Sequence, residues 1–183
     1  MSPYTPEQLR NRFKELKFTW YNFHIIGVRA KQHEPDKFQD NIYVAWGNTL
    51  YCYSATTIPG LHWLQTLMNP AGTAIVVADK QYTDAYKLGL HKGNPALIQA
   101  KPLLVYRDNN RNNKAEEIGT PVTAGPECRI DIHGANKNLR SVLIGSWSAG
   151  CQVLNDPVQF TEFISLCRRT GLGNFTYTLL GEF

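Results

Sequence analysis

Short runs of apolar, aromatic and β-branched residues recur along the chain, and residues that favour turns separate them. Such runs are typical of β-strands, because an amphipathic helix needs a longer pattern with a 3.6-residue period. One pair of runs, with Gly47 and Asn48 between them, predicts a hairpin. We predict strands at residues 20–29, 42–46, 49–53, 72–78, 103–107, 129–133, 142–144 and 175–180.

Two helices are predicted near the ends of the chain by their capping sequences. Thr5 and Asp156 are each followed by a proline and then, at the capping-box position, by a glutamine. A third, short helix is expected at residues 61–68. In the last helix, one face carries Phe160, Phe163, Ile164 and Cys167. Strands with flanking helices predict an α+β, β-rich fold.

Length and composition favour one domain over residues 1–183. The content of hydrophobic residues is 43% and that of charged residues is 19%, which excludes a disordered chain. No apolar run approaches the roughly 20 residues of a membrane helix, so no membrane insertion is expected. Residues 1–16 contain no apolar core of a signal peptide, so synthesis in the cytoplasm without such a signal is expected.

The formal net charge is +4, and the basic residues are dispersed along the chain. Since no nucleic-acid-binding motif is present, we expect no nucleic-acid partner. The four cysteines show no CxxC spacing, which favours reduced thiols over a disulfide framework. No pattern indicates an oligomeric state.

A candidate for chemistry comes from one His and one Cys in turn-like settings. His133 ends a predicted half-buried strand, whose alternation places Ile130 and Ile132 on one face and Asp131 and His133 on the other. Asp131 can therefore support the imidazole, although a plain surface carboxylate is the alternative interpretation. Cys151 follows in a turn rich in Gly and Ser.

A thiolate is a strong nucleophile, and a nearby imidazole lowers the pKa of the thiol and stores its proton for the leaving group. Free N–H groups of Gly150 and Cys151 would stabilise the oxyanion of a tetrahedral intermediate. His133 and Cys151 therefore predict amide exchange or hydrolysis. A buried, inert Cys is the commoner alternative for an isolated pair of this kind.

The residues His133-Gly134, Ile144-Gly145, Ser148, Gly150 and Cys151 resemble the signature of the L,D-transpeptidase catalytic domain, also called the YkuD domain. In that family an H-G pair is followed by S-H-G-C and then by Arg or Asn two positions beyond the Cys. The resemblance covers residues 128–155. It implies that a peptidoglycan stem peptide acylates Cys151, that His133 is the base, and that the Gly134 carbonyl orients its imidazole.

The resemblance also implies an L,D-transpeptidase-like sandwich or mixed sheet, no cofactor and no metal. Other phrases of the chain are similar to phage and prophage proteins that carry this domain. We therefore expect a phage endolysin-type hydrolase that acts at the bacterial cell wall, in a virion or free. Arg140, Trp147 and Ser148 are candidates for substrate contacts, and Ser148 can equally serve the turn alone.

Two positions depart from the family pattern. Ala149 stands where the family has its second His, and Val153 stands where it has Arg or Asn. Gln152 lies one position too early to replace the latter. These departures leave the choice between transfer and hydrolysis open. They also support the alternative of a catalytically altered wall-binding or virion structural module.

A metal-dependent alternative uses other histidines. His62, His91 and His133 together with Asp131 would form a zinc hydrolase site, although the sequence has no HExxH or paired-Cys spacing. Thiol chemistry and metal chemistry thus give different expectations for which side chains lie beside His133.

Overall fold

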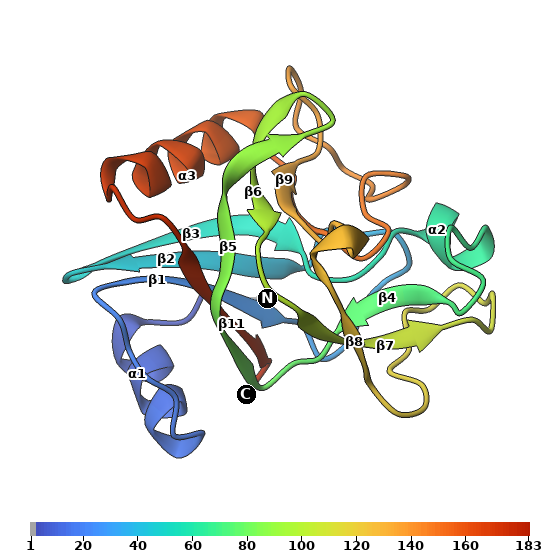
Figure 1. The fold of residues 1–183 in the computed structure, drawn as a ribbon, viewed down its shortest axis with the longest axis horizontal. Coiled ribbons are helices and arrows are strands. Elements are labelled where there is room, and N and C mark those ends of the chain that lie inside the picture. The colour runs from blue at the N-terminus through green and yellow to red at the C-terminus, as the bar shows by residue number, and fades with distance from the viewer. Residues whose placement is uncertain (1–2) are drawn as a thin grey trace.

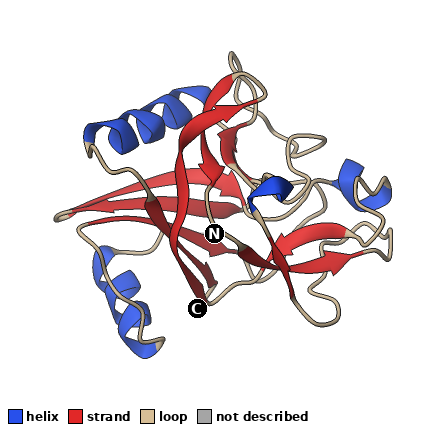
Figure 2. Ribbon diagram, in the orientation of Figure 1, coloured by secondary structure: helices blue, strands red, loops and turns tan. Residues whose placement is uncertain are grey.

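The computed structural model describes residues 3–183, and its main feature is an eight-stranded mixed sheet that closes into a barrel. Figure 1 shows the barrel with helix α3 across one side, helix α1 below it and a small sheet on the other side. Figure 2 shows how strongly strands outweigh helices. The barrel strands, in spatial order, are β1 (Phe23–Arg29), β11 (Phe175–Gly181), β5 (Lys80–His91), β6 (Asn94–Gln99), β9 (Ile132–Gly134), β10 (Gln152–Leu154), β3 (Thr49–Thr56) and β2 (Asp40–Trp46).

The remaining elements surround this barrel. The helices are α1 (Pro6–Glu15), α2 (Leu61–Gln65), α3 (Pro157–Arg169) and the 3-10 turn η1 (Pro126–Cys128). A three-stranded sheet has the order β4 (Thr73–Val76), β7 (Leu103–Asp108) and β8 (Val122–Ala124). The β-rich α+β class is confirmed, and so is the mixed sheet, because β1–β11 and β9–β10 are parallel. The sheet closes on itself instead of forming the expected sandwich.

Both helix caps predicted from the sequence are present. Thr5 and Gln8 form the complete reciprocal capping box of α1. At α3, the Asp156 side chain accepts hydrogen bonds from the Val158 and Gln159 N–H groups. The Gln159 amide does not complete a capping box there, since its oxygen is buried without a hydrogen-bond partner among residues 3–183.

Strand β1 is buried on both faces, which explains why apolar residues point to either side of it. Ile25 faces the barrel core, whereas Ile26 and Val28 pack outside against Leu9 and Phe13 of α1. Helix α1 therefore seals one outer face of the barrel. Burying two such faces stabilises the barrel by about 1.5–3 kcal/mol for each large side chain removed from water.

Two strand predictions are wrong. Residues 142–144 form no strand, and the side chains of Val142 and Leu143 are 71% and 51% exposed. The segment predicted as a half-buried strand at residues 129–133 starts as a strand only at Ile132, because Arg129 has a φ of 52°. Both Asp131 and His133 are buried, so this strand has no solvent-facing side.

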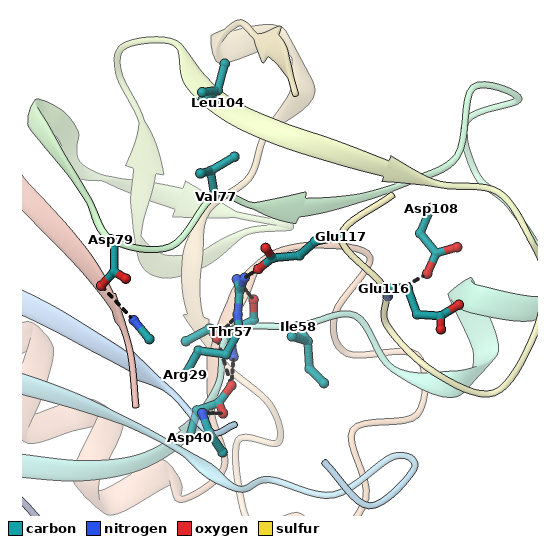
Figure 3. Close-up of polar contacts among 12 residues, drawn as sticks. Arg29, Asp40, Thr57, Ile58, Val77, Asp79, Leu104, Asp108, Glu116 and Glu117 are labelled. Carbon is teal, nitrogen blue, oxygen red and sulfur yellow. Dashed lines mark hydrogen bonds and ion pairs between the residues drawn. The ribbon is translucent and has the colours of Figure 1, made fainter. Parts of the chain in front are cut away.

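A polar network, with the buried residues Arg29 and Asp40 at its centre, lies between the barrel and the small sheet, as Figure 3 shows. Arg29 donates to the hydroxyl and carbonyl oxygens of Thr57 and forms an ion pair of 2.9 Å with Glu117. Asp40 accepts from the N–H and hydroxyl of Thr57 and from His33. Because Glu117 belongs to the connection between β7 and β8, this network fastens that connection to the barrel.

Among residues 3–183, no helix combines the length and the apolar character needed to span a membrane.

The buried His24 makes stability sensitive to acid. Its ring is fully buried, its Nε2–H faces Thr178 Oγ1 at 2.8 Å, and burial lowers its pKa to about 3. Below its ordinary pKa of 6.5 the unfolded chain binds the proton and the folded chain does not. The contribution of His24 to stability is therefore fully present above pH 6.5 and falls by about 1.4 kcal/mol per pH unit toward pH 3.

We expect urea denaturation at successive pH values to show a steeper loss of stability below pH 6.5 in the wild-type protein than in His24→Gln, by the contribution of this one group. His62→Gln is the matched control, because it makes the same replacement at an exposed histidine. Equal slopes in wild type and His24→Gln would rule out this origin of the acid sensitivity.

Candidate active site

His133 and Cys151 lie on adjacent parallel strands, which brings them together despite their separation in sequence. His133 is in β9, Cys151 immediately precedes β10, and the ladder pairs Gln152 with Ile132 and Val153 with His133. A ring nitrogen of His133 and Cys151 Sγ lie within 4.8 Å of each other. The proximity expected from the sequence is thus present in the structure.

The imidazole of His133 has a defined orientation. Its Nδ1 faces the Gly134 carbonyl oxygen at 2.9 Å and donates to it, so Nε2 carries the free lone pair. Nε2 is buried and has no hydrogen-bond partner among residues 3–183. Gly134 has no room for a Cβ, since such an atom would lie 2.8 Å from the ring of Phe160 on α3.

The electrostatics keep both groups of the pair neutral. Burial lowers the pKa of His133 to about 4, against a smaller raising effect of the hydrogen bond to Gly134. Burial also raises the pKa of the Cys151 thiol to about 12. At neutral pH the pair is therefore a thiol and an unprotonated imidazole, not a preformed ion pair.

The turn before Cys151 is held by several polar contacts. Ser148 is fully buried, and its hydroxyl donates to the Cys151 carbonyl and accepts from the Gly150 N–H at 3.2 Å. The Gly60 N–H donates to the Ser148 carbonyl. Ser148 thus serves the turn. The Gly150 N–H is not free, whereas the Cys151 N–H makes no hydrogen bond to any of residues 3–183.

A cleft of about 590 Å³ opens beside His133, between α3, the β5–β6 turn and the loops around β9. Trp147, predicted as a substrate contact, lines this cleft, whereas Arg140 is exposed and does not. Three cationic side chains line it, and no acidic residue does within the described part of the chain. The cations are Lys92, Lys137 and Arg168.

Cys151 is not among the residues that line the cleft. Its side chain packs with Phe38, Ala135 and Val153, and Sγ donates to the Arg129 carbonyl at 3.4 Å. The thiol therefore lies behind the wall formed by His133.

A second imidazole stands beside the first. The ring of His91, at the end of β5, stacks on that of His133 with centroids 4.1 Å apart. Its Nδ1 contacts Asp131 at 2.8 Å, and Asp131 also accepts from Arg129 and from the Gln99 N–H. Burial raises the pKa of Asp131, but these hydrogen bonds outweigh it and leave the pKa below its usual value. Asp131 is thus a buried anion beneath His91, not a surface carboxylate.

His62, a member of the metal-dependent alternative, belongs to α2, where its ring packs on Trp63. Within residues 3–183, the donor atoms that come together are those of His91, His133 and Cys151.

Sequence reasoning did not predict the stacking of His91 or the cationic lining of the cleft. The turn between β5 and β6 has two residues of positive φ, Lys92 and Gly93, which is the geometry of a tight hairpin. The pair Lys92-Gly93 is the signal in the sequence that indicates such a turn and therefore places His91 at the end of a strand. Comparisons with protein-family models, curated proteins and solved structures found no match to this chain.

Proposed function

We propose that this protein is a cysteine-dependent acyl-transfer enzyme of the L,D-transpeptidase type that acts on peptidoglycan stem peptides. The observation that carries the proposal is the His133 imidazole, which the Gly134 carbonyl orients, whose Nε2 is unpartnered among residues 3–183, and of which one ring nitrogen lies within 4.8 Å of Cys151 Sγ. This is the arrangement that the family resemblance implies for its base and nucleophile. The adjacent parallel strands β9 and β10 bring both residues together.

In the proposed mechanism, Cys151 Sγ attacks a peptide carbonyl carbon while His133 Nε2 takes the thiol proton. The Cys151 N–H is the available donor for the oxyanion. His133 then gives its proton to the leaving amine as the C–N bond breaks, leaving a thioester on Cys151. Water or an amine attacks the thioester, His133 takes its proton, and the thiol is regenerated.

The cleft matches an acidic peptide. Lys92, Lys137 and Arg168 offer positive charge to carboxylates, which stem peptides carry, and Trp147 and Phe160 offer apolar surface. The cleft volume of about 590 Å³ is in the range of sites for small ligands of this kind. We further propose a phage endolysin-type role at the cell wall, in a virion or free.

We expect mass spectrometry of purified sacculi incubated with the protein to show new peptide fragments. A fragment that gains the mass of water indicates hydrolysis, and a fragment joined to an added amine indicates transfer. When the reaction is stopped with acid, the mass of the intact protein should rise by the mass of one peptide acyl group bound to Cys151 as a thioester. The absence of both products and the adduct would contradict the enzymatic proposal.

A second candidate function is a wall-binding or virion module without catalysis. The burial of the Cys151 thiol behind His133 favours it, because a buried thiol with a raised pKa is a poor nucleophile at rest. Sedimentation with sacculi, without any released fragment, is the outcome expected for this candidate.

A further inference from the structure

Three soft or borderline donor atoms converge at one point beside the cleft. One ring nitrogen each of His91 and His133 and the sulfur of Cys151 all lie within 4.8 Å of one another. They come from three strands or strand ends, β5, β9 and the residue before β10, and the barrel holds these strands in register. A donor set of one sulfur and two imidazoles is one that zinc prefers.

The second contacts of the two imidazoles point to the same use. His91 directs Nδ1 to the Asp131 carboxylate at 2.8 Å, and His133 directs Nδ1 to the Gly134 carbonyl at 2.9 Å. A metal-bound histidine characteristically donates its other ring N–H to a carboxylate or a carbonyl, which fixes the tautomer and orients the ring. Here both rings do so, and each leaves the lone pair of Nε2 free.

A buried polar atom without a hydrogen-bond partner is further support for a metal site among these three residues. His133 Nε2 is buried and accepts no hydrogen bond from any of residues 3–183. A buried acceptor without a partner costs about 1–3 kcal/mol. Asp131 is itself held by Arg129 and by the Gln99 N–H, so the outer contacts are preorganised before any ion arrives.

We propose that His91, His133 and Cys151 bind one Zn²⁺ ion, with Asp131 and the Gly134 carbonyl as the outer contacts that orient the two imidazoles.

Binding forms one Zn–S bond and two Zn–N bonds, and the proton of the Cys151 thiol leaves to solvent. Three protein ligands would leave a fourth position for a water molecule, as in other zinc sites of this kind. The bound ion occupies both the sulfur and the base nitrogen. It therefore blocks acyl transfer, a consequence that rests on the proposed function, whereas the binding of zinc does not.

Only a small adjustment is needed to accommodate the ion. Donor atoms around a tetrahedral zinc ion lie about 3.5 Å apart, which follows from Zn–S and Zn–N bonds of about 2.3 and 2.0 Å. The three atoms here must close by up to about 1.3 Å from their limit of 4.8 Å to reach that spacing. The two rings stack at an interplanar angle of 10°, so one ring must tilt. His91 is the ring free to tilt, because its side chain is 17% exposed and lies at the cleft.

The test is titration of the reduced, metal-free protein with Co²⁺ and then Zn²⁺. We expect one equivalent of Co²⁺ to produce a near-ultraviolet thiolate-to-cobalt band and visible bands of a four-coordinate ion, and one equivalent of Zn²⁺ to abolish both. Zinc should also raise the melting temperature, because an ion that binds only the folded state stabilises it.

Variants distinguish this site from adventitious binding. Cys151→Ser should lose the thiolate band, His91→Ala should lose the four-coordinate bands, and Asp131→Asn should weaken zinc binding about 10–100-fold. Cys128→Ser and His62→Ala alter an exposed thiol and an exposed imidazole and should change nothing. The absence of the thiolate band in wild type, or its full retention in His91→Ala or Cys151→Ser, overturns the site.

Activity on sacculi separates the two proposals. Fragments released by the metal-free protein and suppressed by one equivalent of Zn²⁺ support both. Metal binding without release of fragments under any condition supports the zinc site and contradicts the cysteine mechanism. Release of fragments that requires Zn²⁺ leads to the same two conclusions. Release that Zn²⁺ does not affect, from a protein that binds no Co²⁺, contradicts the zinc site alone.

Discussion

Cys151→Ser is expected to abolish release of peptide fragments from sacculi, by a factor of about 10³ or more, while the protein stays folded. A serine hydroxyl is far less acidic than a thiol, so it yields its proton to His133 less readily, and it is a far weaker nucleophile. The fold is retained because the replacement has nearly the same volume, and its hydroxyl can donate to the Arg129 carbonyl as the thiol does. Mass spectrometry of the supernatant measures the release.

Cys128→Ser is the matched control for this experiment. Cys128 is exposed and contacts only Arg107 through its sulfur, so its replacement should leave the release of fragments unchanged. Circular dichroism and thermal melting of both variants separate a chemical loss from unfolding. Undiminished release by folded Cys151→Ser would refute the assignment of Cys151 as the nucleophile.

Gly150→Ala is expected to destabilise the protein by about 3 kcal/mol or more and to remove activity with it. Gly150 has a φ of 119°, which an alanine adopts only with strain, costing about 1–3 kcal/mol. An added Cβ would also lie 2.6 Å from the backbone oxygen of Ala74 in β4, and neither backbone can yield freely. The turn that carries Cys151 must therefore move away from the small sheet. Urea denaturation measures the loss of stability.

The same turn provides the control variant. Gly145 also has a positive φ, of 53°, but no atom of residues 3–183 lies within 4 Å of the position of its Cβ. Gly145→Ala should thus cost only the strain of the left-handed conformation, about 1–2 kcal/mol. Equal losses in Gly145→Ala and Gly150→Ala would show that the contact with Ala74 contributes nothing.

Local patterns in the sequence predict the elements that begin or end with characteristic capping or turn residues. The capping residues Thr5 and Asp156 predict the starts of the two long helices, and Gly47-Asn48 predicts the turn between β2 and β3. The buried strand at residues 72–78 was also identified, as the shorter strand β4. These features depend on contacts between near neighbours in the chain, which a local pattern records.

Features that depend on distant partners were missed. Strand β5 carries polar and charged residues at several positions, so its sequence lacks a clear apolar alternation, and its ladder with β11 and β6 makes it a strand. Conversely, residues 142–144 are apolar but form no strand, because no neighbouring strand pairs with them beyond the single bridge of Lys37 to Leu143. Ile144 is buried, whereas Val142 and Leu143 are exposed. Apolar composition alone therefore gave a wrong strand there.

The candidate site was predictable only in part. The sequence indicated His133, Cys151 and the orienting carbonyl of Gly134, and the structure brings these groups together. It gave no indication that His91 stacks on His133, since that contact requires β6 to lie between β5 and β9 in the barrel. The burial of Asp131 had the same origin, because its partners Gln99 and His91 come from the β5–β6 hairpin.

The β9–β10 ladder has a consequence for how the segment between its strands can vary. Because paired backbones hold His133 and Val153 side by side, the distance between imidazole and sulfur does not depend on the number of residues that connect them. Lys137, Asn138 and Leu139 at the tip of that connection are exposed, so insertions there would lengthen a surface loop and leave the reacting atoms in place. Chains of this fold can therefore differ in the interval between these two positions and still bring the imidazole and the thiol together.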